Sequence, residues 1–306
     1  MASLDPPSAR SARRTFVGVV LALGVLYLVW GSTYLAIKIA VETIPPYTML
    51  AGRFLAAGGL LYGYLRLTGA AHPTLAEWRG SALIGTLLLV AGLGSVTLAE
   101  SMGVSSGVAA VVVSTMPLWF ALFTLFWRGR VGALEWAGMG LGLLGVALLN
   151  AEADLRANPL AAVILFFAPV GWAFGSVWSR NLPQPPGLMA SAAQMVAAGF
   201  VFVPVALLRG ETLTRMPSLD SSVALLYLIT FGSLLAYSAY IYLLNRNVRP
   251  ALLSSYAYVN PVVAVLLGVF FAGERVSTGG LVGIGVILLG VVLAVSGKAA
   301  GKPKDD

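Results

Sequence analysis

The stretch 251–274, ALLSSYAYVNPVVAVLLGVFFAGE, decides the fold of this chain. It is an apolar run long enough to cross a bilayer, for which about 20 residues suffice. Asn260 and Pro261 lie near its middle. Proline removes one backbone donor and frees the carbonyl group of Ala257, four residues earlier. Hydrocarbon tolerates such a break only where protein or a water-filled cavity satisfies the freed groups. The stretch therefore predicts a membrane-spanning helix that faces other helices or a cavity.

The composition of the whole chain is that of a membrane protein. Its 306 residues are 58% hydrophobic and only 10% charged, and the mean hydropathy is +0.89. Soluble domains carry about 25% charged residues. We therefore predict an all-α membrane protein with ten transmembrane helices joined by short loops. The predicted spans are 16–41, 47–66, 80–99, 104–127, 133–150, 159–179, 187–208, 221–244, 250–272 and 278–297.

The positions of lysine and arginine predict the orientation of these spans. Cytoplasmic loops of membrane proteins carry an excess of basic residues. If the N-terminus lies inside, 13 of the 19 basic residues fall on the inner side. An even number of spans then returns the chain to the side on which it started. Residues 1–15 and 298–306 are accordingly predicted to be cytoplasmic tails.

The chain also repeats internally. Pro117, in the stretch 104–130, and Pro261 are 144 residues apart, and Gly31-Ser32 and Gly175-Ser176 show the same offset. Pro117 and Pro261 are therefore predicted to break corresponding helices. Five spans per repeat is an odd number, so the second copy must enter the membrane from the opposite side. Inverted repeats of this kind are a common plan of secondary transporters, with the solute site near the midplane.

Several kinds of chemistry are excluded or disfavoured. The chain has no cysteine, which excludes disulfides and thiolate nucleophiles, and its single histidine, His72, is predicted to be a solvated loop residue. No phosphate-binding loop is present, so ATP is not the direct energy source. The +7 net charge follows membrane orientation and does not indicate nucleic acid. We predict no enzymatic activity, no cofactor and no metal site.

At this point four motifs resemble the EamA-type transporters of the drug/metabolite transporter superfamily, in particular a bacterial inner-membrane branch. The resemblance covers about residues 16–297. It is carried by residues 29–34 (VWGSTY), Arg53-Phe54, residues 172–176 (WAFGS), and residues 255–261 (SYAYVNP) running to Gly273-Glu274.

This resemblance implies two inverted five-helix repeats, 16–150 and 159–297, and export of amino acids, metabolites or toxic small molecules from the cytoplasm. It also implies a multi-pass protein of the bacterial inner (plasma) membrane. One departure concerns the end of the fourth helix. The first repeat of such proteins often ends this helix with Gly-Glu, as Gly273-Glu274 does in the second, but this chain has Gly129-Arg130.

Nine aromatic and polar residues are predicted to line a cavity near mid-depth. Polar groups at that depth need partners or a wet cavity, and aromatic walls with a few hydroxyl and amide groups suit a small amphipathic solute. The alternative is packing and hydrogen bonding between helices. The nine predicted residues are Trp30, Ser32, Tyr34, Trp119, Trp172, Tyr237, Tyr256, Tyr258 and Asn260.

Four charged residues are predicted to cluster toward the outer face: Lys38, Arg53, Glu100 and Glu274. A charge at the bilayer centre costs about 2.5–3.5 kcal/mol on insertion scales. We expect Lys38 to extend toward the surface. For Arg53, the deepest of the four, the hypothesis is an outer gate in which it pairs with Glu100 or Glu274. No acid is predicted at mid-depth, which favours facilitated diffusion, or ion coupling through the outer carboxylates.

The sequence thus favours a transporter that exports amino acids or other small amphipathic metabolites by alternating access. The predicted partners are a small-molecule solute and the lipid bilayer, and the chain is expected to be a monomer or a weak dimer. The alternative is a lipid scramblase or a non-transporting membrane assembly partner. A lipid-exposed polar groove would favour the scramblase, whereas an enclosed aromatic cavity favours the solute carrier.

Overall fold

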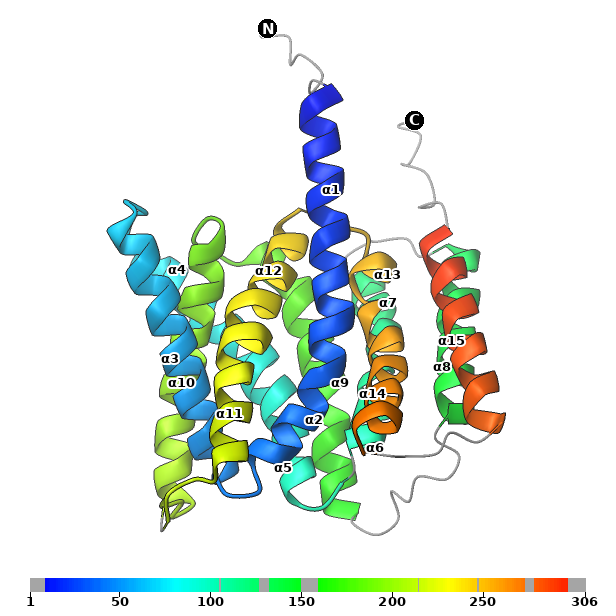
Figure 1. Cartoon of the computed structure of the whole chain (residues 1–306). Helices are drawn as coiled ribbons and strands as arrows, with labels where there is room; N and C mark the ends of the chain where they lie inside the picture. The colour runs from blue at the N-terminus through cyan, green and yellow to red at the C-terminus, as the bar shows by residue number, and fades with distance from the viewer. Residues whose placement is uncertain are drawn as a thin grey trace, which may run out of the picture.

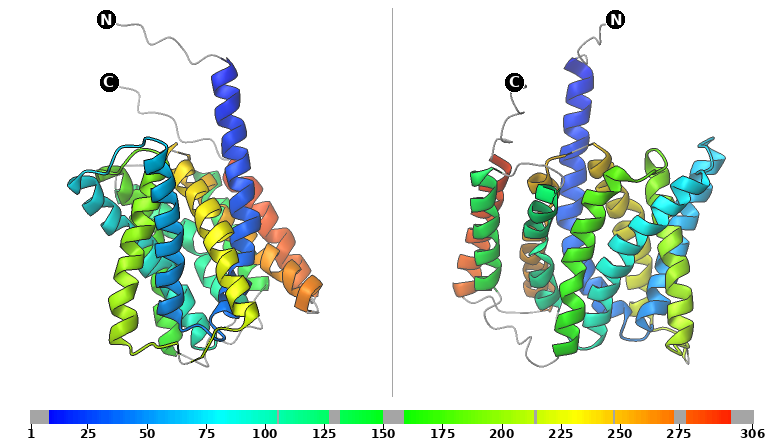
Figure 2. Two further views of the ribbon diagram at one scale, coloured as in Figure 1. Left: turned by 60° about the vertical axis from the view of Figure 1, so that its left-hand side comes forward. Right: turned by 180° about the vertical axis from the view of Figure 1, so that it is seen from behind.

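The computed structural model describes residues 9–104, 106–126, 132–149, 159–213, 215–246, 248–272 and 278–296, and over these residues it is helical, without strands. Figure 1 shows the helices packed side by side as a bundle. Helix α1 begins and helix α15 ends at the same end of this bundle (Figures 1 and 2). We call it the α1 end.

Several helices of the first half of the chain follow one another without a loop. Helices α1, η1 and α2 are contiguous, and so are α4, η2 and α5. The bounds are α1 (Ala9–Val25), η1 (Leu26–Trp30), α2 (Gly31–Ala40), α3 (Pro46–Leu67), α4 (Leu75–Gly85), η2 (Thr86–Gly94), α5 (Ser95–Ser101), α6 (Ser106–Val113), α7 (Met116–Phe126) and α8 (Ala133–Leu149).

The second half has a similar arrangement, with α11, η5 and α12 contiguous. The bounds are α9 (Pro159–Trp178), η4 (Ser179–Asn181), α10 (Leu188–Leu208), α11 (Leu219–Tyr227), η5 (Leu228–Tyr237), α12 (Ser238–Asn245), α13 (Pro250–Leu253), α14 (Tyr256–Ala272) and α15 (Thr278–Ser296).

Local sequence signals explain where these helices begin and end. Thr74 and Glu77 form a capping box at the start of α4, in which each side chain binds the backbone N–H of the other. Gly69 and Gly210 follow the ends of α3 and α10 with φ of 93° and 67°. A helix often ends in this left-handed conformation, which glycine adopts without strain.

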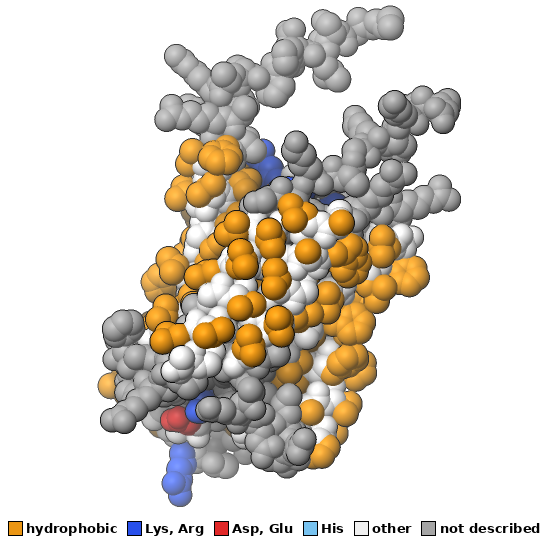
Figure 3. Space-filling model, turned by 90° about the vertical axis from the view of Figure 1, so that its right-hand side faces the viewer, with side chains coloured by type: hydrophobic (Ala, Val, Ile, Leu, Met, Phe, Trp, Pro, Cys, Tyr) orange, Lys and Arg blue, Asp and Glu red, His pale blue; other side chains and the backbone are white. Residues whose placement is uncertain are grey.

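The outer surface of the bundle is suited to lipid. Five helical stretches within the described residues are long and apolar enough to cross a membrane. Figure 3 shows the face formed by α8 and α15, where hydrophobic side chains gather, and Leu144, Leu281 and Leu288 are among the exposed residues of these two helices. The five stretches are Phe16–Ala40, Leu75–Ser101, Pro159–Asn181, Leu188–Leu208 and Leu219–Asn245.

Helices from the two halves of the chain pack against each other. Helix α3 packs along α10, and α8 packs along α15 (Figures 1 and 2). Glycines allow the first pair to approach closely, because a Cβ on Gly58 would lie 2.7 Å from the backbone nitrogen of Val196. Small residues at helix contacts are the usual way for membrane helices to pack.

The segments that contain Pro117 and Pro261 are both interrupted, but not in the same way. Turns at Ser114-Thr115 and Ser254-Ser255 separate α6 from α7 and α13 from α14. Pro117 is the second residue of α7, next to its turn. Pro261 lies inside α14, which continues through it. The predicted break at Pro261 is therefore wrong in position, because neighbouring helices let a membrane helix continue past a proline.

Three of the long helices contain π-helical segments near their middle, namely η1, η2 and η5. A π-helical turn holds one more residue than an α-helical turn and often marks a functional site. Trp30 ends η1, Gly92 lies in η2, and Gly232 and Tyr237 lie in η5. These four residues line the same cavity.

Candidate functional site

A cavity lies between the helices of the bundle. Its volume is about 60 Å³. One water needs about 10–15 Å³ of such space, so the cavity has room for roughly four to six waters. Its walls come from both halves of the chain: Trp30, Thr33, Tyr34, Ile37, Arg53, Phe54, Leu89, Gly92, Leu93, Val96, Val113, Met116, Ala168, Trp172, Gly232, Tyr237, Tyr256 and Asn260.

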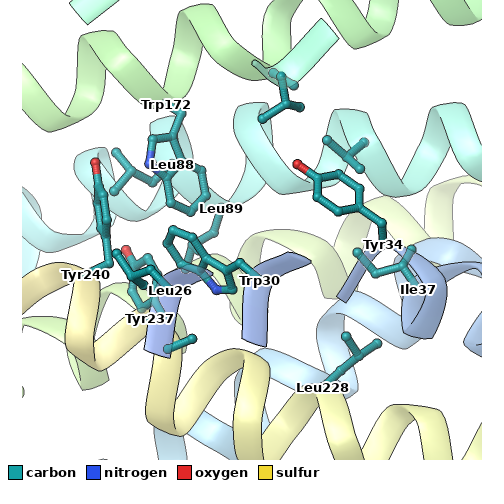
Figure 4. Close-up of a cluster of buried hydrophobic side chains, with 14 of the residues drawn as sticks. Leu26, Trp30, Tyr34, Ile37, Leu88, Leu89, Trp172, Leu228, Tyr237 and Tyr240 are labelled. Atoms are coloured by element: carbon teal, nitrogen blue, oxygen red, sulfur yellow. The ribbon is translucent and has the colours of Figure 1, made fainter. Parts of the chain in front are cut away.

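Aromatic rings form one wall of this cavity. Trp30 lies 5.3 Å from Trp172 and 4.9 Å from Tyr256, measured between ring centroids, and both pairs meet edge to face. Tyr240 packs behind them, 5.4 Å from each tryptophan. Figure 4 shows these two tryptophans with Tyr237 and Tyr240, and the hydroxyl of Tyr34 directed toward them. Such edge-to-face pairs stabilise a cluster by about 0.5–1.5 kcal/mol each beyond simple burial.

Arg53, on α3, places a guanidinium group in the wall of this apolar cavity. The residue is 2% exposed. Its Nε donates to the hydroxyl of Ser233 at 2.8 Å, and Gly232 leaves room for Nη2, to which a Cβ would come within 2.8 Å. Its Nη1 has no hydrogen-bond partner. The sequence analysis placed Arg53 in an outer gate, which stays a prediction; the structure places Arg53 in the wall of the central cavity.

Asn260 and Tyr34 add neutral polar groups to the wall. The side chain of Asn260 is 2% exposed, and that of Tyr34 is 7% exposed. The carbonyl oxygen Oδ1 of Asn260 has no partner. Across the cavity, the Tyr256 hydroxyl donates to the sulfur of Met116 at 3.1 Å. Residues of the cavity wall therefore carry one buried acceptor and two buried donors without partners, namely Asn260 Oδ1, Arg53 Nη1 and Trp172 Nε1.

Six of the nine predicted cavity residues line this cavity, and three point elsewhere. The hydroxyl of Ser32 is shared between Tyr227, at 2.5 Å, and the carbonyl oxygen of Val29. Trp119 packs on Phe123 and Phe166. Tyr258 donates to the carbonyl oxygen of Met139 at 3.4 Å. For these three residues the alternative of interhelical packing describes the structure better.

Of the four predicted outer charges, Lys38, Arg53 and Glu100 lie within the described residues. Lys38 is exposed, as expected, and it is the charged neighbour of Glu100. Glu100 is 6% exposed, and neither of its oxygens has a hydrogen-bond partner. Within the described parts of the chain no hydrogen bond connects Arg53 to a carboxylate. Glu274 and Arg130 lie outside the described residues, so the pairing with Glu274 stays a prediction.

A second, polar cavity lies at the α1 end of the bundle. Its volume is about 270 Å³, and Arg180, Gln184, Gln194 and Asn245 are among its lining residues. Gln194 receives a hydrogen bond from the Tyr237 hydroxyl at 2.5 Å, and its own amide donates to Gln184 at 2.9 Å. Because Tyr237 lines the central cavity and Gln194 lines the polar one, their hydrogen bond lies between the two cavities.

We predict that Tyr237→Phe makes the central cavity more accessible from the α1 end. The change removes only the hydroxyl that bonds Gln194, and one neutral hydrogen bond corresponds to about a two- to tenfold shift in an opening equilibrium. A cysteine introduced at Ala168, in the cavity wall, reports access in a chain that has no cysteine of its own. Its labelling by a maleimide from that side is expected to become faster.

The matched control is Tyr256→Phe, which also removes a hydroxyl from the cavity wall. That hydroxyl bonds Met116 and does not lie between the cavities. Labelling of the Ala168→Cys protein should therefore change little in this variant. Equal labelling rates for Tyr237→Phe and the unchanged protein would show that the Tyr237–Gln194 bond does not hold the cavities apart.

A bundle of apolar helices around an aromatic-walled cavity is the architecture of a membrane transporter. The chain belongs to the EamA-like transporter family, which matches residues 16–151 and 159–296.

Comparison with individual proteins supports the same class. The inner membrane transporter YedA of Escherichia coli (strain K12) is 48% identical over 277 residues, which cover 90% of each chain. A probable amino-acid metabolite efflux pump of Salmonella typhimurium is 24% identical over 88% of this chain and 92% of its own length. A protein crystal structure shares the fold with a TM-score of 0.74 at 21% identity, over 90% of this chain and 96% of that one.

Proposed function

We propose that this protein is a secondary transporter that exports amino acids or other small amphipathic metabolites across the bacterial inner membrane by alternating access. The observation that carries the proposal is the aromatic cavity whose lining residues include buried polar atoms without partners, among them Arg53 Nη1 and Asn260 Oδ1. Buried polar atoms without partners are costly in a membrane protein and mark sites of function. A bound solute would satisfy both atoms.

The topology proposed for this function is ten spans in two inverted repeats, 16–150 and 159–297, with both ends cytoplasmic. Support comes from the packing of the helices. Helix α9 packs on η2 and α7, and the corresponding first-half helices, η1 and α2, pack on η5, α11 and α14. Contacts that recur when the two halves are exchanged are expected of a twofold arrangement. The shared end of α1 and α15 fits an even number of spans (Figure 1).

The size of the cavity supports a transport cycle with a closed state. Pockets that bind small molecules measure about 300–1,000 Å³, whereas this cavity measures about 60 Å³. A solute therefore enters only when the helices around the cavity separate. With the α1 end on the cytoplasmic side, the polar cavity beside Gln194 would be the entrance, and the bond between Tyr237 and Gln194 would close it.

The proposed substrate class and direction draw on the relatives and on the cavity wall. One relative is named as an amino-acid metabolite efflux pump, and the aromatic wall suits the apolar part of such a solute. The cavity lies inside the bundle, with Trp30, Arg53 and Asn260 all buried, and this favours a solute carrier over a scramblase with a lipid-exposed groove. The proposed working unit is a monomer or a weak dimer.

Counterflow in proteoliposomes tests the proposed function. The purified full-length protein should exchange at least one radiolabelled solute from a panel of amino acids, nucleosides and aromatic toxins. Asn260→Ala removes the unpartnered acceptor and is expected to lower exchange at least tenfold. A tenfold change corresponds to the loss of about 1.4 kcal/mol of interaction free energy. Asn181→Ala, at an exposed position, is the control that should retain exchange.

Uptake equal to that of empty liposomes across the whole panel would contradict the transporter proposal. Movement of fluorescent lipid between leaflets in the same liposomes, with no solute exchange, would favour the scramblase. Both assays use the same preparation of liposomes. Lipid movement would therefore show that the protein has inserted, even if no solute is exchanged.

A further inference from the structure

Two contacts fix the position and orientation of the buried guanidinium group of Arg53. Its Nε donates to Ser233 of η5 at 2.8 Å, and its Cζ lies 5.2 Å from the ring centroid of Phe54. Two helical elements, α3 and η5, therefore fix one edge of the planar group. The other edge carries Nη1, which has no hydrogen-bond partner and belongs to a residue in the cavity wall.

The charge of Arg53 lacks a compensating anion within the described residues. Glu100 is the buried carboxylate of the adjacent helix α5, but its charged neighbour is Lys38, and its oxygens bond no donor. An unpaired charge inside a membrane protein is costly, and residues of this kind mark solute or ion pathways. An anion that enters the cavity would remove this cost.

A carboxylate matches the groups that are present. Guanidinium binds a carboxylate through two parallel N–H donors, and such charge-assisted bonds are about twice as strong as neutral ones. The rest of the wall is apolar and aromatic, so it suits the hydrocarbon part of the same molecule. Asn260 also lines the cavity, and its Oδ1 is an acceptor without a donor. The wall thus offers one place for an anionic group and one for a hydrogen-bond donor.

We propose that Arg53 binds the carboxylate of the transported solute, so that the substrates of this protein are amphipathic carboxylates. The inference rests on the proposed transport function and names its substrate class. An α-amino acid would place its carboxylate on Arg53 and its ammonium group on Asn260 Oδ1, while a simple fatty acid would use Arg53 alone. Neutral solutes of the same shape would leave the guanidinium unpaired and bind weakly.

Binding to the full-length protein in lipid nanodiscs tests this assignment. Isocaproate and isocaproamide have the same shape and differ in charge, and L-leucine adds an ammonium group to isocaproate. Titration of the fluorescence of tryptophan, two of which (Trp30 and Trp172) line the cavity, gives the half-saturating concentration of each. The acid is expected to bind at least about tenfold more tightly than the amide, because hydrogen bonds to charged groups are the strong ones.

Variants identify the residue responsible for this preference. In Arg53→Gln the ratio between acid and amide should fall to about one. Arg209→Gln removes a positive charge at an exposed position outside the cavity and should leave the ratio unchanged. Ser233→Ala keeps the charge of Arg53 and removes the bond that orients it, so the ratio should fall partway. This milder variant preserves the test if Arg53→Gln does not fold.

Three outcomes would overturn the proposal. The first is equal binding of isocaproate and isocaproamide to the unchanged protein. The second is an acid preference that persists in both Arg53→Gln and Ser233→Ala. The third is recovery of transport in the double variant Arg53→Glu with Glu100→Arg, which would make Arg53 a gate partner of Glu100. In each of these outcomes the unchanged protein would still exchange solutes in the counterflow assay. If the transport proposal itself is wrong, the protein exchanges no solute in that assay.

Discussion

Replacement of Gly58 by valine is expected to destabilise the protein by about 1–3 kcal/mol, as overpacking of a well-packed contact does. The same replacement at the next residue, Gly59, should change the stability by no more than about 0.5 kcal/mol. The two positions share one helix, α3, and one chemical change. They differ in what a side chain would meet.

The contact between α3 and α10 gives the reason for this difference. A Cβ on Gly58 would lie 2.7 Å from the backbone nitrogen of Val196 and 2.9 Å from the Cβ of Met195. Backbone atoms inside a helix cannot move aside as the end of a long side chain can. Gly199 of α10 approaches Leu55 of α3 in the same way. Around Gly59 no atom of the described structure lies within 4 Å of such a Cβ.

Thermal melting of the two variants in one detergent measures the effect. Gly58→Val should melt at a lower temperature than both Gly59→Val and the unchanged protein, and it should lose transport at temperatures that the others tolerate. Equal melting of the two variants would mean that α3 and α10 are not in close contact. Since α3 carries Arg53 and α10 carries Gln194, the shared contact also fixes the distance between the cavity wall and the second cavity.

The bounds of the helices were readable from the sequence because hydropathy and loop residues determine them. The predicted span 47–66 agrees within one residue at each end with α3, Pro46–Leu67, and the predicted span 159–179 agrees equally well with α9, Pro159–Trp178. Loops here begin and end at proline, glycine and polar residues, such as Pro45 and Gly69. A membrane helix must also be long enough to cross the hydrocarbon, which leaves little freedom in its length.

Which side of each helix faces the cavity was harder to predict. These helices are apolar on all sides, so the usual periodicity of a buried face is missing. The π-helical segments add a second difficulty. An inserted residue rotates all later side chains by about 100° around the helix axis. Ser32 lies two residues after the end of η1 and bonds Tyr227 instead of lining the cavity, although its depth was compatible with the cavity.

Arg53 shows the same limit, because the sequence predicted its depth but not its neighbours. Its distance from the end of the helix suggested an outer gate, because distance along the chain gives depth only. Contact with Ser233 and Gly232 depends on how α3 packs against η5, which no local pattern encodes. Gly232 leaves space for the guanidinium group, but its position opposite Arg53 cannot be read from the sequence.

Replacement of Trp30 by alanine is expected to have the largest effect of any change in the cavity wall. Loss of a buried tryptophan costs about 3–5 kcal/mol, since it leaves an empty space. Trp30 contacts Trp172, Tyr240 and Tyr256 through its ring, and its Nε1 donates to the carbonyl oxygen of Gly232 at 3.3 Å. The variant should therefore melt at a lower temperature and also lose solute exchange.

Two further variants separate these effects. Trp30→Phe keeps an aromatic ring and loses the bond to Gly232, so it should recover most of the stability and part of the exchange. Trp136→Ala removes a tryptophan that is 38% exposed on α8, away from the cavity, and should retain exchange. If Trp30→Ala instead exchanged solute as fast as Trp136→Ala does, the aromatic wall would not be where the solute binds. Exchange that is lost in Trp30→Ala at temperatures well below its melting point would show that the wall binds solute as well as stabilising the bundle.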